Sequence, residues 1–390
     1  MEKILAIIGM ILIIGGTYLF SRNKKEINWK SVGCAFIGQL ILAFILIKTP
    51  AWKIVEFIAN VISWILTQAG EGINFVFGGI SENFVFFINS LLPIVFISSL
   101  IGLLFHFGIL QKFISIVGNT IAKMLNVDTT IAVNGVGNMF LGQTDSLFLT
   151  KQLLPSATDS VIFATLVGGM TSISTSVVGL YASYGASMEW IIVSMPLTVF
   201  STFILTQILM PTKYNENSCV EVETDDKGIN AIETMMNYAT AGFKSVVGIA
   251  VALMVFISAV ALINNVIGLF TDGVTLQSIL GFIFAPIAVL MGVPYGEVME
   301  VSQILATKLV TNETVAFALP EFAMLSENVK AMVTVTLCGF AGIGSISILM
   351  GGYSAIAPSK VRTVAHLGVK ALLTATFVNI ITGAIIGLFL

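Results

Sequence analysis

Residues 132–176 constrain the fold more than any other stretch of the chain. They contain three apolar runs, and the short polar tip GQTDS at 142–146 separates the first run from the second. The third run carries the hydroxyl-rich sequence TSISTS at 171–176, which is too polar for a helix that faces lipid. Polar groups are costly in hydrocarbon unless they face a cavity, a partner or a solute. This stretch therefore predicts a polar site inside a membrane, where a small polar solute is bound and moved across.

Apolar runs continue along most of the chain, and the composition agrees with a membrane protein. Of the 390 residues, 56% are hydrophobic and only 10% are charged. A soluble domain carries about 25% charged residues, so this chain has too few to cover a surface in water. The runs are continuous rather than alternating, which favours membrane helices over a β-barrel. The net charge of −3 gives no indication of nucleic-acid binding. We predict an all-α integral membrane protein.

We expect about eight transmembrane helices. A helix needs about 20 mostly apolar residues to cross the hydrocarbon core. The expected spans lie at 4–20, 32–47, 84–109, 161–184, 190–210, 246–269, an interrupted stretch that includes 335–347, and 369–388.

The basic residues predict the orientation of these spans. Lys24 and Lys25 follow the first run, as in a stop-transfer anchor. The positive-inside rule places them in the cytoplasm and the N-terminus outside. With eight spans, Lys112, Lys123 and Lys360 then also fall inside. We expect a multi-pass protein of the cell membrane, either inner or plasma membrane.

Residues 51–67 have a different pattern. Lys53, Glu56, Asn60 and Ser63 recur at steps of three and four residues, so they form a polar stripe on an otherwise apolar helix. Such a helix lies in the membrane interface rather than across the membrane. We therefore predict an interfacial amphipathic helix here.

Two polar tips are each flanked by apolar runs too short to cross a membrane. The first pair of runs is 132–141 and 147–154, and the second is 304–310 and 315–319, around TNET at 311–314. We predict two re-entrant hairpins, because broken elements are tolerated at membrane depth only where protein buries them or where they line water. Lys151 and Lys308 lie within these hairpins, and we expect both to extend their ammonium groups to water.

The second half of the chain repeats the plan of the first. ATLVGGMTSIS at 164–174 and VTLCGFAGIGSIS at 335–347 both read as an apolar helix, glycines and Ser-Ile-Ser, and each follows a polar tip. We expect the glycine pair at 168–169 and the hydroxyl cluster to interrupt the first of these helices. Interrupted segments at corresponding places in two halves indicate the binding site of a transporter built from an inverted repeat. The predicted organisation is N-terminal spans, interfacial helix and scaffold (1–130), first repeat (131–210), polar cytoplasmic loop (211–230), scaffold span and apolar segment (231–295), and second repeat (296–390).

Asp145 and Glu313, one at each tip, are the strongest candidates for the solute site. An acid flanked by apolar segments is a functional candidate by default, although an acid at a tip can also simply reach water. Gln143, Thr144 and Asn312 add paired donors and acceptors, which suit a solute rich in hydroxyl and amide groups.

A cation site is the second candidate. Asn138, Ser172 and nearby backbone carbonyls offer oxygen ligands, and a broken helix frees carbonyls that suit Na⁺. Taken alone, Ser172 is as well explained as a packing residue between helices.

Several motifs resemble those of the concentrative nucleoside transporter family. GQTD at 142–145 resembles its Gly-Gln-Thr-Glu tip, and NETVA at 312–316 resembles its Asn-Glu-Phe-Val-Ala motif. Residues 281–297 resemble its Gly-Tyr-x-Phe-Ala-Pro stretch followed by Met-Gly-Val-Pro and an acid. CGFA at 338–341 resembles the start of its Gly-Phe-Ala-Asn-Phe-Ser-Ser segment. The resemblance extends from about residue 30 to the end, with the motifs in the family's order.

The resemblance implies a secondary transporter, not an enzyme, that takes up nucleosides with Na⁺ or H⁺ and assembles as a homotrimer with eight spans and two hairpins. It assigns nucleobase contacts to Gln143, Thr144, Asp145 and Val177, and ribose contacts to Glu313 and Ser345. It assigns Na⁺ to Asn138, the Leu141 carbonyl, Ser172 and the Ile173 carbonyl. Because both side-chain ligands are present, we favour Na⁺ over H⁺.

Three departures from the family concern the solute. Asp145 replaces Glu, Thr314 replaces Phe, and Gly342 stands where the family has an Asn that helps to hold the ribose. Losing one hydrogen-bonding partner in a buried site costs about 1–3 kcal/mol. Either another group or water therefore substitutes, or the cargo resembles a sugar or a base but is not a ribonucleoside. A membrane protein that binds a solute without transporting it is a separate alternative. A membrane enzyme lacks support, because the sequence has no paired histidines, metal set or nucleophile motif.

Overall fold

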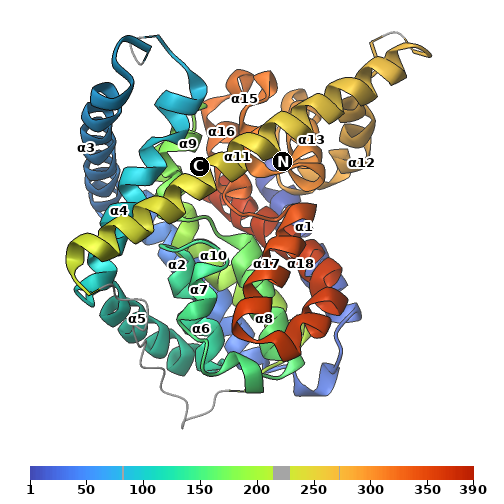
Figure 1. The fold of residues 1–390 in the computed structure, drawn as a ribbon. Coiled ribbons are helices and arrows are strands. Elements are labelled where there is room, and N and C mark those ends of the chain that lie inside the picture. The colour runs from blue at the N-terminus through green and yellow to red at the C-terminus, as the bar shows by residue number, and fades with distance from the viewer. Residues whose placement is uncertain (81–82, 214–228, 272) are drawn as a thin grey trace.

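The structure, a computed structural model, describes residues 1–80, 83–213, 229–271 and 273–390. Within these residues every regular element is helical, which confirms the predicted all-α class (Figure 1). Most of the predicted polar loop at 211–230 lies outside the described residues.

Seven helical segments are long and apolar enough to cross a membrane. They are α1 (Glu2–Leu19), α2 (Trp29–Lys48), Phe87–His106 with η3 (Phe87–Leu91) and α4 (Pro93–His106), Asp159–Ser183, α10 (Met188–Leu209), α11 (Ala231–Gly268), and Pro358–Phe389 with η7 (Pro358–Lys360) and α18 (Val361–Phe389). The remaining predicted span is the pair α16 (Glu327–Leu337) and α17 (Ile343–Ile356), separated by a break.

Both of the helices predicted to be interrupted are broken in the structure. The segment Asp159–Ser183 consists of α8 (Asp159–Thr171), η5 (Thr175–Val177) and α9 (Val178–Ser183), so it breaks at the hydroxyl cluster. The expectation that Gly168 and Gly169 interrupt the helix is wrong, because both lie inside α8. Gly169 allows close packing instead, because a methyl group there would lie 3.2 Å from Cδ2 of Leu349.

Short helices flank both polar tips. The first set is α6 (Thr129–Asn138), α7 (Asp145–Phe148) and η4 (Leu154–Ser156), and the second is α13 (Val298–Val310), α14 (Glu313–Phe317) and α15 (Pro320–Met324). α6 begins before the predicted run because the Asp128 side chain caps it, accepting from Thr130 N. Entry and exit on one face of the membrane stays a prediction.

The scaffold helices are longer than the sequence predicted. α3 (Trp52–Phe77) extends the interfacial helix past residue 67 and ends where Gly78 adopts a positive φ. α11 begins at Ala231, well before 246, because Asn230 caps it by accepting from Glu233 N. It crosses the front of the molecule and packs along α4 (Figure 1). The predicted apolar segment that follows this scaffold span contains α12 (Leu276–Leu290). α5 (Ile109–Leu125) packs beside α6.

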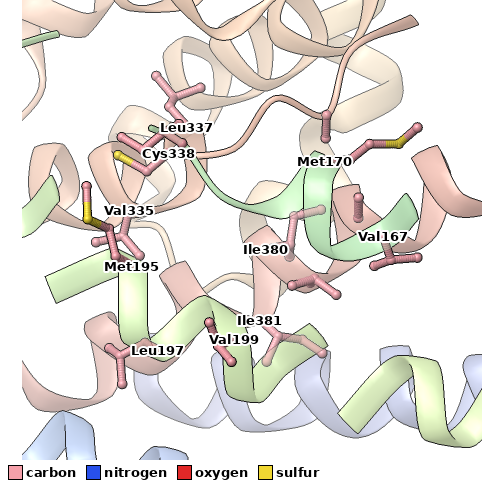
Figure 2. Packing of buried hydrophobic residues seen from close by; sticks show 14 of the residues in the cluster. Val167, Met170, Met195, Leu197, Val199, Val335, Leu337, Cys338, Ile380 and Ile381 are labelled. Carbon is pink, nitrogen blue, oxygen red and sulfur yellow. The ribbon is translucent and has the colours of Figure 1, made fainter. Parts of the chain in front are cut away.

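The core forms where the two repeats meet. α18 packs against α8, α10 and α16, and Figure 2 shows apolar side chains from these four helices in one cluster. The labelled residues are Val167 and Met170 of α8, Met195, Leu197 and Val199 of α10, Val335 and Leu337 of α16, Cys338, and Ile380 and Ile381 of α18.

Glycine sets the spacing between α18 and α16. A methyl group on Gly383 would lie 1.9 Å from Oγ1 of Thr336 and 2.9 Å from the Met332 carbonyl oxygen. Small residues at such crossings let helix backbones approach closely within a membrane. The two helices therefore touch through a position that tolerates no side chain.

We expect Gly383→Ala to push α18 away from α16 and to destabilise the protein by about 1–3 kcal/mol, as overpacking does. Thermal unfolding of the purified protein in detergent measures this. Gly15→Ala is the matched control, because a methyl group there meets nothing within 4 Å. Equal melting temperatures for the two variants would show that the α16–α18 crossing can relax.

Candidate functional site

Each hairpin tip packs against the break of the broken helix in its own repeat. In the first repeat, Ser174 Oγ donates to the Phe140 carbonyl at 3.2 Å, and Thr175 Oγ1 donates to the Met139 carbonyl at 2.9 Å. In the second repeat, a methyl group on Gly342 would lie 3.0 Å from the Thr311 carbonyl oxygen. The hydroxyl cluster therefore has a structural task, which is to hold the first tip against the break.

The tips also contact the opposite repeat. A methyl group on Gly352 of α17 would lie 3.0 Å from Cγ2 of Thr144 in the first tip. In the other direction, Tyr181 of α9 donates its hydroxyl proton to Oε1 of Glu313 at 3.0 Å. Its ring stacks on Phe317 with centroids 4.7 Å apart. Residues from both repeats are thus brought to one place, as the repeated motifs predict.

Glu313 is the buried acid of this site. Its side chain is 7% exposed, and Thr314 Oγ1 lies 3.4 Å from Oε1, alongside the Tyr181 hydroxyl. Thr314, which replaces a phenylalanine of the family motif, thus adds a hydroxyl beside the carboxylate. Asn312 is a helix cap: its Oδ1 accepts from Val315 N at 2.9 Å and fixes the start of α14.

Gln143 carries the clearest sign of a ligand. Its side chain is 8% exposed, and its buried Oε1 has no hydrogen-bond partner among the described residues. A buried acceptor without a partner costs about 1–3 kcal/mol, and such groups are uncommon in native proteins. A solute that donates to Oε1 would recover this free energy.

The other predicted solute contacts differ in their exposure. Asp145 is exposed, with Thr144 Oγ1 3.5 Å from its Oδ1, so the two acids occupy different environments. Val177 and Ser345 are buried, and Ser345 Oγ donates to the Phe340 carbonyl. Ser345 lies in the first turn of α17, directly after the break.

The predicted cation ligands lie in the region where α6 packs on α8. A methyl group on Gly168 would lie 3.7 Å from Nδ2 of Asn138, and Ser172 Oγ donates to the Gly168 carbonyl at 3.1 Å. Asn138 Oδ1 accepts from Ser146 Oγ at 2.6 Å. The amide, hydroxyl and backbone oxygens of this region, including the Leu141 and Ile173 carbonyls, are hard donors of the kind that Na⁺ sites in transporters use.

Sequence reasoning missed Tyr181 and misplaced Lys308. Tyr181 follows Val177 by one helical turn, and a phenol within an apolar run usually seeks a hydrogen-bond partner, so a signal was present. The expectation that Lys308 reaches water is wrong: its side chain is 4% exposed, and its Nζ donates to the Thr336 carbonyl at 2.6 Å. The approach of α16 that buries it cannot be read from the sequence.

Two family models match the chain. The model described as "Na+ dependent nucleoside transporter N-terminus" matches residues 8–80, and "Na+ dependent nucleoside transporter C-terminus" matches residues 190–387.

Similar proteins match along the full length of the chain. An uncharacterized transporter of Haemophilus influenzae is 34% identical, covering 100% of this chain and 98% of that protein. The nucleoside permease NupC of Helicobacter pylori is 30% identical, with the same coverage. The solved structure of CNTnw in an inward-facing substrate-bound state is similar with a TM-score of 0.94 at 30% identity, covering 100% of this chain and 98% of that one.

We expect Tyr181→Phe to destabilise the protein, because Glu313 loses a buried donor. Hydrogen bonds to charged groups contribute about 1.5–3 kcal/mol. Thermal unfolding in detergent measures the loss, and Tyr295→Phe is the control, since Tyr295 is exposed. An unchanged melting temperature for Tyr181→Phe would show that another group takes the place of the phenol.

Proposed function

The chain belongs to the concentrative nucleoside transporter family, and from this premise we propose that it imports nucleosides by symport with Na⁺. It is a multi-pass membrane transporter and not an enzyme. The observation that carries the proposal is the pair of polar groups at the two tips. Gln143 has a buried oxygen that finds no hydrogen-bond partner among the described residues, and Glu313 is a buried carboxylate.

We assign the nucleobase to the first tip and the ribose to the second. Gln143, Thr144 and Asp145 offer donors and acceptors to a base, and Val177 offers an apolar surface beside them. The ribose hydroxyls would donate to Glu313 and bond with Ser345, while Asn312 holds the start of α14.

The coupling ion would be held by Asn138, Ser172 and the carbonyls of Leu141 and Ile173. Na⁺ supplies a charge that draws these oxygens together, so it would order the first hairpin against α8 and raise the affinity for the nucleoside. Linkage requires that the nucleoside raise the affinity for Na⁺ by the same factor. A proton is the alternative coupling ion.

The second candidate is the same transport with a cargo other than a ribonucleoside. Gly342 favours this second candidate, because a glycine has no side chain that could hydrogen-bond a ribose hydroxyl. The close approach of the Thr311 carbonyl also leaves little room for one. A solute with fewer sugar hydroxyls would lose less from the missing partner than a ribonucleoside does.

We also propose a homotrimer in the cell membrane, with the N-terminus outside. The family resemblance supports an assembly, and α11 offers a surface for it, since only 11% of the residues in its most apolar stretch are buried within one chain. Its exposed residues include Val251, Met254 and Val255.

We expect Asp145→Ala and Glu313→Ala each to lower uptake of radiolabelled uridine by at least about tenfold, because each removes a charged hydrogen-bonding group worth about 1.5–3 kcal/mol. Uptake is measured in cells that lack their own nucleoside transport. Immunoblots of the membranes verify insertion. Glu327→Ala is the control, since that carboxylate is exposed at the surface. Wild-type uptake rates in either tip variant would overturn the assignment of the solute site.

A further inference from the structure

Lys308 and Glu313 are the only charged side chains that are buried among the residues the structure describes. They carry opposite charges and lie on the same hairpin, in α13 and at the start of α14. Burying a charge costs several kcal/mol unless it is paired and hydrogen-bonded. The carboxylate has a place in the solute site. The ammonium has no role in that site and requires another explanation.

The ammonium of Lys308 lies at the end of a broken helix. Nζ donates to the carbonyl of Thr336. This carbonyl lies in the last turn of α16, where the helix has no further N–H group to bond it. The side-chain amide of Asn379 in α18 is oriented so that it bonds both Lys308 and Thr171. Its oxygen accepts from Nζ at 2.8 Å. The same amide donates to the Thr171 carbonyl at 3.0 Å.

Two helix ends therefore lie beside one cation. Thr336 accepts from the ammonium directly, and Thr171 is linked to it through Asn379. Thr171 is the last residue of α8, and Thr336 precedes the last residue of α16. The C-terminal end of a helix carries a partial negative charge, which a cation stabilises. Gly339 makes the convergence possible, because a methyl group there would lie 2.6 Å from the Thr171 carbonyl oxygen.

The first repeat has no fully buried cation, because Lys151 on its hairpin is only partly buried. The residues of α6, TTIAVNGVGN, are all neutral, and at its end lies Asn138, a proposed ligand of the coupling ion. The second repeat instead has its own positive charge, Lys308, where its hairpin meets its broken helix. This asymmetry separates two otherwise similar halves.

We propose that Lys308 is a built-in cation, which fastens the second hairpin to the end of α16 and balances the carboxylate of Glu313. The Glu313 side of the solute site is then formed without a bound ion, while the Gln143 side needs one. Lys308 is thus a positioning residue. Its expected effect on solute affinity rests on the proposed transport function, whereas its expected effect on stability does not.

The first test removes the charge and keeps the length of the side chain. We expect Lys308→Met to lower the affinity for uridine by more than about tenfold, because the hairpin that carries Glu313 loses its bonds to Thr336 and Asn379. Binding of radiolabelled uridine to purified protein measures this. Lys330→Met is the matched control, since Lys330 is only partly buried and pairs with the exposed Glu327. Affinity equal to that of the control would overturn the proposal.

The second test restores the cation from solution. Lys308→Ala lacks a propylammonium group, and a small cavity lined by Leu305, Thr336 and Asn379 already borders the site. We expect propylammonium to raise the melting temperature and the uridine affinity of Lys308→Ala, and neutral 1-propanol of similar size to do neither. Propylammonium is kept in the purification buffer, so that a variant that folds only with the cation is recovered.

The two readouts separate the two claims. Equal rescue by 1-propanol, or no rescue of the melting temperature by propylammonium, would show that Lys308 only fills space and would overturn the built-in cation. Wild-type protein that does not bind uridine would instead contradict the nucleoside cargo. In that case, a melting temperature of Lys308→Ala that is raised by propylammonium but not by 1-propanol would still support a cation at the helix ends.

Discussion

The structure depends on how two helix ends are satisfied in the interior of a membrane protein. α8 ends at Thr171 and α16 at Leu337, and neither the lipid nor bulk water can bond the carbonyls left there. The protein provides partners from the hairpins and from α18. Asn379 donates to Thr171, and Lys308 donates to Thr336 and to Asn379. The break after α16 is therefore stabilised by the docked second hairpin, and the same bonds hold that hairpin in place.

This arrangement brings residues of the two repeats into contact. Tyr181 of the first repeat bonds Glu313 of the second, and Thr144 of the first tip lies against Gly352 of α17. The repeats are similar in plan but differ in electrostatics. Asp145 is exposed and Glu313 is buried, and only the second hairpin carries a buried ammonium. In the proposed mechanism only the Gln143 side of the site requires a cation from solution, so the binding of ion and solute is coupled through that side.

The sequence was sufficient for the class, the spans and the two breaks, because these follow from hydropathy and from polar residues that hydrocarbon does not tolerate. It also located both tips and their acids. It misjudged the lengths of α3 and α11, whose polar turns lower the local hydropathy while Asn230 and Gly78 set where the helices begin and end. It attributed the first break to Gly168 and Gly169, which pack inside α8 instead. The burial of Lys308 was not predictable, since it requires α16, α18 and the hairpin to be placed together. The Na⁺ ligands and the solute contacts stay predictions.

The central claim is that this chain accumulates nucleosides by using a cation gradient. The most direct measurement is uptake of radiolabelled uridine and adenosine into proteoliposomes, with and without an inward Na⁺ gradient. The account predicts accumulation that depends on the Na⁺ gradient and stops when it is collapsed. Accumulation driven by a proton gradient alone would contradict the Na⁺ site at Asn138 and Ser172. No flux of either nucleoside under either gradient, from folded protein, would contradict the nucleoside cargo and turn attention to Gly342 and Asp145.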